Sequence, residues 1–327
     1  MRMTTRPGAA LALLSLLTAC SGSPRPEASV RAGAGAEPSD DPAVDPLSHT
    51  LDAALARGSW EDLRVDAECQ DEDFRLQSVK LFGTGVGIWN DTRQFAVPRE
   101  RLLGVLEALR RAGFGSMRES HGGRDDAGKM GLELICRVRA VLDGVEKQSY
   151  QLSKGRQSAE LRELAGQILA VGEDLGPSGV AAASLEEGLG KIARGELAPE
   201  ALTLQLQRQA EDPRSTEGGW ILRVEDGKAQ LTFSSPETGW TDPRRVRLSR
   251  EDLAGIARNL LEARPEELPA NLYSSWYQDL EIRVLNHKKS LQARRFAGVT
   301  PETHGERQER FDRLVAALED LEKRLGS

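Results

Sequence analysis

Few side chains in this 327-residue sequence could do chemistry, because it holds only four His and three Cys. One stretch brings a hydroxyl, an imidazole and carboxylates together: Ser120, His121, Asp125 and Asp126. A nucleophile, its base and an orienting acid could hydrolyse a substrate, but such groups usually come from distant segments. The sequence therefore favours a solvated loop here, with a catalytic or metal-binding role as the alternative.

Two further motifs resemble ligand loops without having the required spacing. Residues 83–87 spell G-T-G-V-G, whereas a dinucleotide-binding loop needs G-x-G-x-x-G between a strand and a helix. An acidic run could offer oxygen ligands to calcium, but it lacks the D-x-D-x-D-G pattern of a calcium loop. The run consists of Asp66, Glu68, Asp71, Glu72 and Asp73. We expect a tight turn at the first motif and a charged turn at the second, with weak calcium binding as the alternative.

The cysteines and histidines predict neither a metal site nor a cofactor site. No C-x-x-C or H-E-x-x-H pattern is present. Cys69 and Cys136 could form a disulfide if the protein folds in an oxidising compartment. The alternative is that Cys136 is a free, buried side chain on a strand and that Cys69 lies in a turn. The sequence therefore names no catalytic residue and no metal ligand.

A small aromatic group is the clearest candidate for binding a partner. Tyr273, Trp276 and Tyr277 lie close together in a chain with 5% aromatic residues. Exposed aromatic side chains on a loop often anchor a protein or a sugar. The alternative is that these side chains cover a sheet edge or a domain junction.

The N-terminus carries the most specific motif of the chain. Arg2 and Arg6 precede an apolar run from Ala9 to Leu17, which is about half the length of a spanning helix. The run ends in Leu17-Thr18-Ala19-Cys20, which resembles the lipobox of bacterial lipoproteins. The resemblance implies that residues 1–19 are a signal peptide and that Cys20 is acylated and binds the lipid bilayer.

Further expectations about localisation follow from this resemblance. In bacteria with two membranes, Ser21 after the acylated Cys20 favours the outer membrane, since Asp at this position commonly retains lipoproteins at the inner one. Residues 20–58 are predicted to be a flexible tether, because they are rich in Pro up to about Pro46 and show no apolar periodicity. The expected place of the protein is therefore the bacterial cell envelope.

Composition bounds the remaining classes of protein. The net charge is −7, with 44 basic and 51 acidic residues, which argues against nucleic acid as a partner. The chain is long enough for about two domains of ordinary size.

An internal repeat organises those domains. Residues 89–100 (WNDTRQFAVPRE) match residues 240–251 (WTDPRRVRLSRE), and the match continues from Leu102/Leu253 to Ala112/Ala263. The repeated Trp, Asp and Arg could hold a ligand, but a duplicated structural turn explains them more simply. They are Trp89, Asp91 and Arg93 in the first segment and Trp240, Asp242 and Arg244 in the second.

Periodicity predicts the same element order in both copies. Asp226-Gly227 and Asp143-Gly144 each separate two alternating segments, as in β-hairpins, and Ser249 is the predicted cap of a helix. The predicted fold class is α+β: two tandem β-β-β-α-β-β-α units, over residues 60–172 and 219–325. Each has an antiparallel sheet with helices on one face. Residues 173–218 are predicted to form a helical linker, with short helices over 184–194 and 199–209.

The sequence thus predicts a membrane-anchored envelope lipoprotein that acts as a non-enzymatic scaffold or binding protein, with an envelope protein or polymer as its partner. The alternative is an envelope hydrolase with its site at the junction of the two repeats.

Overall fold

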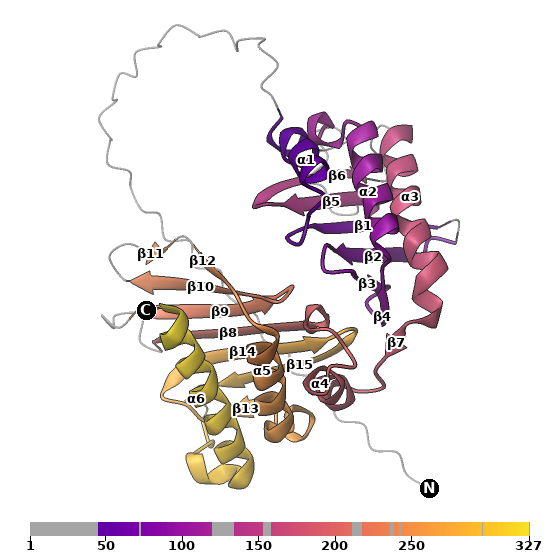
Figure 1. Ribbon diagram of the computed structural model, residues 1–327. Helices are drawn as coiled ribbons and strands as arrows, with labels where there is room; N and C mark the ends of the chain where they lie inside the picture. The colour runs from indigo at the N-terminus through magenta and orange to yellow at the C-terminus, as the bar shows by residue number, and fades with distance from the viewer. Residues whose placement is uncertain are drawn as a thin grey trace, which may run out of the picture. The chain divides into compact units, whose positions relative to one another are not determined.

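The fold is known from a computed structural model of the chain. It describes residues 45–71, 73–119, 134–152, 158–210, 218–235, 239–241, 243–295 and 297–326. These described residues belong to one compact unit. The described residues form a mixed α+β body with six α-helices and two largely antiparallel sheets (Figure 1). None of these helices is both long enough and apolar enough to cross a bilayer.

The first sheet has seven strands in the order β6-β5-β1-β2-β3-β4-β7, and all neighbours are antiparallel. Its strands are β1 (Arg64–Gln70), β2 (Leu76–Phe82), β3 (Val86–Trp89), β4 (Arg93–Ala96), β5 (Leu134–Leu142), β6 (Val145–Leu152) and β7 (Val180–Ala181).

The second sheet has eight strands. Seven follow the order β11-β10-β9-β8-β14-β15-β13, and β12 also pairs with β10. Its strands are β8 (Leu202–Ala210), β9 (Gly219–Glu225), β10 (Lys228–Ser235), β11 (Gly239–Trp240), β12 (Arg244–Arg247), β13 (Asn271–Leu272), β14 (Trp276–Val284) and β15 (His287–Ala293). Only the short β13–β15 pairing is parallel among these neighbours.

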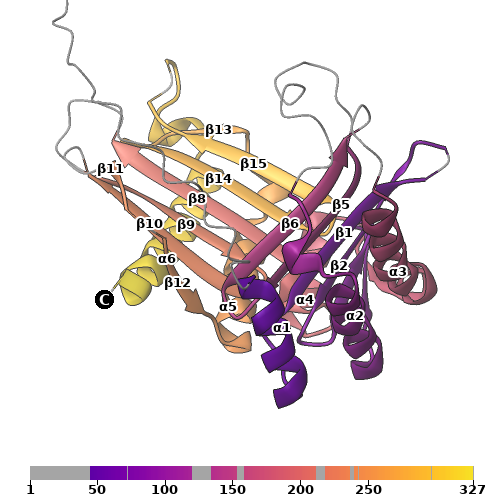
Figure 2. The ribbon, with the colours of Figure 1, turned by 90° about the horizontal axis from the view of Figure 1, so that it is seen from above.

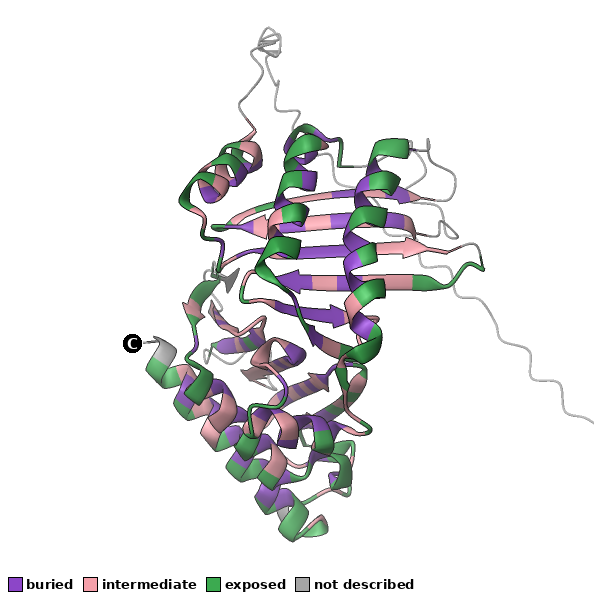
Figure 3. Cartoon of the chain, turned by 45° about the vertical axis from the view of Figure 1, so that its right-hand side comes forward, coloured by how far each residue is buried: buried purple, intermediate pink, exposed green. Residues whose placement is uncertain are grey.

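Helices cover one face of each sheet (Figure 2), and buried residues alternate with less buried ones along the strands (Figure 3). The helices are α1 (Pro46–Arg57), α2 (Arg99–Arg111), α3 (Ala159–Leu175), α4 (Leu185–Ala193), α5 (Arg250–Ala263) and α6 (Glu306–Gly326). Short 3₁₀ turns occur at Phe114–Ser116, Gly176–Ser178, Pro199–Ala201, Pro265–Glu267 and Pro301–Thr303. The opposite face of each sheet carries the polar side chains that matter for the candidate site.

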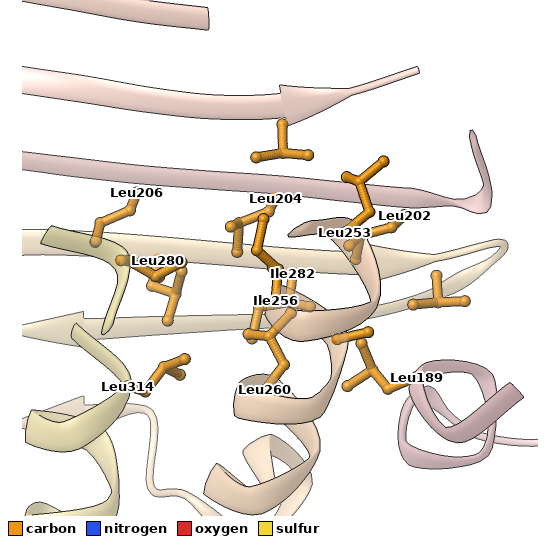
Figure 4. Packing of buried hydrophobic residues seen from close by; sticks show 14 of the residues in the cluster. Leu189, Leu202, Leu204, Leu206, Leu253, Ile256, Leu260, Leu280, Ile282 and Leu314 are labelled. Atoms are coloured by element: carbon orange, nitrogen blue, oxygen red, sulfur yellow. The ribbon is translucent and has the colours of Figure 1, made fainter. Parts of the chain in front are cut away.

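Apolar packing against the helices holds each sheet in place. In the second sheet, Leu202, Leu204 and Leu206 of β8 point toward α5 and α6 (Figure 4). Leu204 is fully buried, so truncating such a side chain costs about 2–5 kcal/mol. The same core cluster also contains Phe82, Val86 and Ile88 of the first sheet.

Several sequence-based predictions of local structure are confirmed. Asp143-Gly144 and Asp226-Gly227 form two-residue hairpin turns in which all four residues have positive φ. This is the backbone of a type I′ turn, which suits the twist of antiparallel strands. Ser249 caps α5 and forms a reciprocal capping box with Asp252.

The predicted helix over residues 199–209 is wrong, because Leu202–Ala210 form strand β8 in the middle of the second sheet. Leu202, Leu204 and Leu206 alternate with polar residues, so the period is two and not 3.6. The second sheet therefore starts within the segment that was predicted to be a helical linker. Of the two short helices predicted there, the first corresponds to α4.

Two further boundaries differ from the predictions. Four strands precede α2, not three, because the short β3 and β4 form a separate hairpin. The predicted tether ends before residue 58, because Pro46–Arg57 form α1. Asp45 caps this helix, and Leu47 and Leu51 are buried in the apolar core of the first sheet. This burial stabilises the helix, whereas the sequence of the Pro-rich segment before it shows no apolar periodicity.

Candidate functional site

The candidate site is a cavity of about 320 Å³ lined by residues of both sheets. The β9–β10 turn of the second sheet forms one wall, and the start of β1 forms another. Seven basic and six acidic side chains line the cavity, so its chemistry is that of charged groups. The acidic ones are Glu61, Asp62, Glu146, Glu200, Glu225 and Asp226.

Arg64 is the centre of the densest charge cluster in this cavity. Its guanidinium donates through Nε to Asp66 Oδ1 at 2.9 Å and through Nη1 to Glu225 Oε1 at 3.1 Å. It also donates through Nη1 to Asp226. Arg64 and Asp66 belong to β1, whereas Glu225 and Asp226 belong to the β9–β10 hairpin, so the cluster links the two sheets.

The balance of charges in this cluster alters two pKa values. Burial and the neighbouring carboxylates Glu225 and Asp66 raise the pKa of Asp226 to about 6, although Arg64 opposes the shift. Burial alone would lower the pKa of Arg64, but the attraction of its carboxylates outweighs burial and raises it. The carboxylate of Asp226 therefore gains and loses its proton close to neutral pH.

Other ion pairs at the cavity are more exposed. Lys228 Nζ lies 3.1 Å from Asp62 Oδ1, and Arg247 Nη1 lies 3.5 Å from Glu61 Oε2. The Glu61 side chain is 74% exposed, so its pairing contributes little to stability and is easily exchanged.

Arg139 forms a further ion pair from the first sheet, with Nε 2.7 Å from Glu146 Oε1. The hydrogen bond from Arg139 lowers the pKa of Glu146, and the charge of Arg245 lowers it further. A cation of the second sheet therefore acts electrostatically on a carboxylate of the first sheet.

Two arginines of the second sheet lack such a carboxylate. Arg223 of β9 donates Nε and Nη2 to the side-chain oxygen of Gln205, at 3.1 and 2.8 Å. Neither Arg223 nor Arg245 forms an ion pair with any carboxylate in the part of the chain that the structure describes. The cavity therefore retains positive charge that its own acids do not directly neutralise.

Sequence reasoning named Asp66 only as part of the acidic run and Asp226 only as a turn residue, and it did not single out the cavity's arginines Arg64, Arg223 and Arg245. The sequence signal that could have indicated this charge is the run Arg244-Arg245-Val246-Arg247. It places three arginines on one short edge strand. The link from Arg64 to Asp226 had no local signal, since the two residues are 162 positions apart.

Two residues of the predicted aromatic group lie on a strand, and the third, Tyr273, lies just before it. Trp276 and Tyr277 begin β14, and all three aromatic residues are half-buried. The guanidinium of Arg208 stacks on the Trp276 ring at 4.1 Å, and Gln308 of α6 hydrogen-bonds both backbone polar groups of Tyr273. These contacts fit the covering role better than the role of a partner anchor.

Cys69 and Cys136 are joined by a disulfide in the structure. Cys69 is at the end of β1 and Cys136 in β5, and the two residues face each other directly across the antiparallel pair. The predicted turn at Cys69 is therefore wrong. The bond connects neighbouring strands of the first sheet on their helix-covered side.

The repeated Trp, Asp and Arg are structural in the first segment. The Trp89 ring packs against Gly172 and Gly176, where an added Cβ would lie 2.2 and 2.6 Å from it. Asp91 pairs with Lys80 at 2.6 Å and not with Arg93, which donates to two backbone carbonyls.

Residues 83–85 form the predicted tight turn between β2 and β3, and Gly85 has a φ of +84°. In the acidic run, Asp71 accepts hydrogen bonds from the amides of Asp73 and Arg75 and closes a turn.

Several predicted sites lie outside the described residues. They are the signal peptide and Cys20, the stretch with Ser120, His121, Asp125 and Asp126, the acidic Glu72, and Asp242. Within the described ranges, no group of three or more His, Cys, Asp or Glu side chains could hold a metal ion. The chemistry that the described cavity offers is ion pairing, hydrogen bonding and proton exchange at Asp226.

No protein-family model matches this sequence, and the search of curated proteins found no match.

Proposed function

We propose that this chain is a lipid-anchored protein of the bacterial envelope whose body binds a charged partner in the cavity between its two sheets. The observation that carries the proposal is the cavity itself. It draws its lining from both sheets, and its basic side chains outnumber its acidic ones. Recognition sites of this kind are concave and hold polar groups that converge on a ligand.

The anchoring part of the proposal depends on Leu17-Thr18-Ala19-Cys20, whose resemblance to a lipobox makes Cys20 the acylated residue. A thiol that carries lipid chains gains about 0.8 kcal/mol for each buried CH₂ group, so several chains anchor firmly. The Cys69–Cys136 disulfide supports export, because such bonds persist in oxidising compartments. Ser21 favours the outer membrane if the cell has two membranes.

We also infer that the two sheets arose by duplication of one module. The strand order β6-β5-β1-β2-β3-β4 of the first sheet corresponds to β15-β14-β8-β9-β10-β12 of the second. In both halves, one helix follows the last strand of this order (α2 after β4, α5 after β12), and another ends the half (α3, α6). The two helices of each half pack on the same face of its sheet. Two related sheets provide two walls for one cavity, which supports a role in gripping a partner.

This correspondence changes the register of the repeat. Arg93 still matches Arg244, since both begin the strand before a helix. Strand pairing matches Trp89 with Leu231, however, because Trp89 lies opposite Arg93 and Leu231 lies opposite Arg244. The sequence alignment of Trp89 with Trp240 is not supported by this register.

The anchoring is tested by mass spectrometry of the mature N-terminus. The full-length gene is expressed in a bacterium, with Cys20→Ala as the comparison. We expect a diacylated or triacylated Cys20 peptide in the wild type, loss of residues 1–19, and retention in the membrane fraction. An unmodified Cys20, or Met1 still attached to mature protein, would refute anchoring.

The binding role is tested by photo-crosslinking in intact envelopes. A photoreactive amino acid replaces Gln230, which lines the cavity, or Arg258, which lies on the exposed face of α5 and serves as the matched control. We expect a discrete adduct from position 230 and none from position 258. Equal labelling from both positions, or none from position 230, would count against a binding cavity.

A specific observation favours hydrolysis as the second candidate function. Asp226 has a pKa of about 6 and lines the cavity beside Glu225, as a general acid next to a carboxylate would. If the protein is a hydrolase of this kind, Asp226→Asn should abolish turnover of envelope polymers, whereas a binding protein shows no turnover in either form.

A further inference from the structure

Four polar residues form a straight row across neighbouring strands of the second sheet. Gln205 of β8 lies opposite Arg223 of β9, Arg223 opposite Gln230 of β10, and Gln230 opposite Arg245 of β12. We call these four residues the arginine row. Their strand neighbours Leu204, Val224 and Ala229 are buried in the core, so the row lies on the face away from the helices.

The arginine row faces the cavity, since Arg223, Gln230 and Arg245 all line it. Its two guanidiniums are two strands apart, which corresponds to about 10 Å between their backbones. The side-chain oxygen of Gln205 accepts both hydrogen bonds from Arg223, so the Gln205 NH₂ group can donate to a ligand. The row therefore alternates amide and guanidinium groups, both of which form planar hydrogen bonds.

The equivalent row of the first sheet has a different chemistry. There Ile88 lies between Lys80 and Gln94, in the place that Gln230 occupies between Arg223 and Arg245. Ile88 is buried and packs in the core cluster of the second sheet.

The neighbouring positions show the same contrast. In the first sheet Val86 lies between Phe82 and Ala96, and Phe82 and Val86 are also buried in that core cluster. The second sheet has Lys228 between Glu225 and Arg247 at these positions, and all three line the cavity.

The first sheet thus uses Phe82, Val86 and Ile88 for packing, whereas the second sheet presents the polar Glu225, Lys228 and Gln230 at the corresponding positions. Burying unpaired charge is costly, so a charged sheet face is retained only where it stays in water or meets a charged partner. Arg223 and Arg245 have no carboxylate in direct contact among the described residues, so their guanidiniums can pair with an external anion.

We propose that the arginine row binds an acidic saccharide, that is, a sugar or short glycan segment that carries carboxylate or phosphate groups. Guanidinium groups pair with such oxyanions through two parallel hydrogen bonds, and the amides of Gln205 and Gln230 match sugar hydroxyls. The cavity volume of about 320 Å³ suits a small ligand or a short stretch of a polymer. This inference rests on the proposed binding role of the cavity.

The exposed pairs beside the row allow such a ligand to enter. Among the described residues, Arg247 pairs with Glu61 and Lys228 with Asp62, whose side chains are 74% and 42% exposed. An anionic ligand can replace these carboxylates at little cost, because exposed ion pairs contribute about 0–1 kcal/mol.

The test is calorimetric titration of the full mature chain in detergent. The probes are an oligogalacturonate, its methyl ester as the neutral match, inorganic phosphate, and vesicles that contain phosphatidylglycerol. The variants are Arg245→Gln, Arg223→Gln and the control Arg258→Gln on α5. The Arg245 guanidinium forms no hydrogen bond with the residues that the structure describes. Thermal unfolding of each variant verifies that it is folded.

We expect the oligogalacturonate to bind, the methyl ester not to bind, and added salt to weaken binding. Each of the two row variants should weaken binding at least tenfold, and Arg258→Gln should leave it unchanged. Competition by inorganic phosphate that depends on the same two arginines would support recognition of the oxyanion itself.

Three results would overturn the proposal: equal binding of the acid and its ester, an equal loss in Arg258→Gln, or no binding of either acidic saccharide or phosphate. Binding of vesicles alone, lost in the row variants, would overturn it in favour of a lipid headgroup. If these titrations fail while position 230 still crosslinks in envelopes, the binding cavity stands and only the ligand class is wrong.

Discussion

The substitution Asp226→Asn separates the charge of the junction cluster from its geometry. Asp226 sits at a positive φ in the β9–β10 turn, and Asn-Gly suits this turn at least as well as Asp-Gly. The Asn oxygen can still accept a hydrogen bond from Arg64, so the change removes a negative charge and little else.

The expected effect follows from the pKa of Asp226. Its pKa rises from 3.8 in the unfolded chain to about 6 in the folded chain. Between these pH values, Asp226 is protonated when the chain is folded and ionised when it is unfolded. Stability therefore falls as pH rises from about 4 to 6, and the loss is complete above 6. At about 1.4 kcal/mol per pH unit, the full loss is roughly 3 kcal/mol.

Because the Asp226 side chain is still 22% exposed, we expect a smaller effect of roughly 1–3 kcal/mol. Asp226→Asn should increase the free energy of unfolding by that amount at pH 8 and by almost nothing at pH 4. Three carboxylates share Arg64 in the wild type, and the variant relieves the repulsion among them.

Urea denaturation at a series of pH values measures this difference. Asp143→Asn is the matched control, since Asp143 occupies the same place in the Asp-Gly turn of the first sheet, with a positive φ, and pairs with exposed Arg57. The control should shift stability by less than about 1 kcal/mol at every pH.

A destabilised Asp226→Asn protein at pH 8 would refute this reasoning, because it would show that the ion pair with Arg64 outweighs burial and repulsion. A wild type that gains stability as pH rises from 4 to 6, relative to the variant, would refute it equally.

Three further predictions concern stability and are measured by urea or thermal unfolding. Gly172→Ala should destabilise the protein by roughly 1–3 kcal/mol, because the added Cβ would clash with the indole ring of Trp89. Gly166→Ala in the same helix adds a Cβ in open space and should stabilise the protein by up to about 1 kcal/mol. Equal effects of the two substitutions would contradict this packing. Replacing Cys69 and Cys136 by Ala should cost roughly 2–4 kcal/mol, since the bond spans 67 residues, and an unchanged midpoint would exclude it. Phe74→Gly should stabilise by about 1 kcal/mol, because Phe74 has a φ of +60° and is 76% exposed; a loss of stability would show that its ring is needed.

Local patterns predicted local structure well. The Asp-Gly turns, the Ser249 cap and the alternating hairpin strands follow from interactions within a few residues of each other. The helix predicted over residues 199–209 was wrong. Pro199 and the preceding helix α4 suggested a second helix, although the alternation of Leu with polar residues already indicated a strand.

The candidate site could not be predicted in this way. Which strand lies beside which is decided by sheet order, so Gln205, Arg223, Gln230 and Arg245 become neighbours only once β8, β9, β10 and β12 are paired. The raised pKa of Asp226 likewise depends on burial and on carboxylates brought together from β1 and β9.

The sequence by itself determined the α+β class, the two Asp-Gly hairpin turns, the Ser249 cap and the lipobox-like motif at Cys20, because each depends on residue type at short spacing. Only the tertiary structure decided where charge gathers. Arg64 and Asp226 are far apart in the chain, and the free energy of a charge depends on its neighbours in space and its access to water.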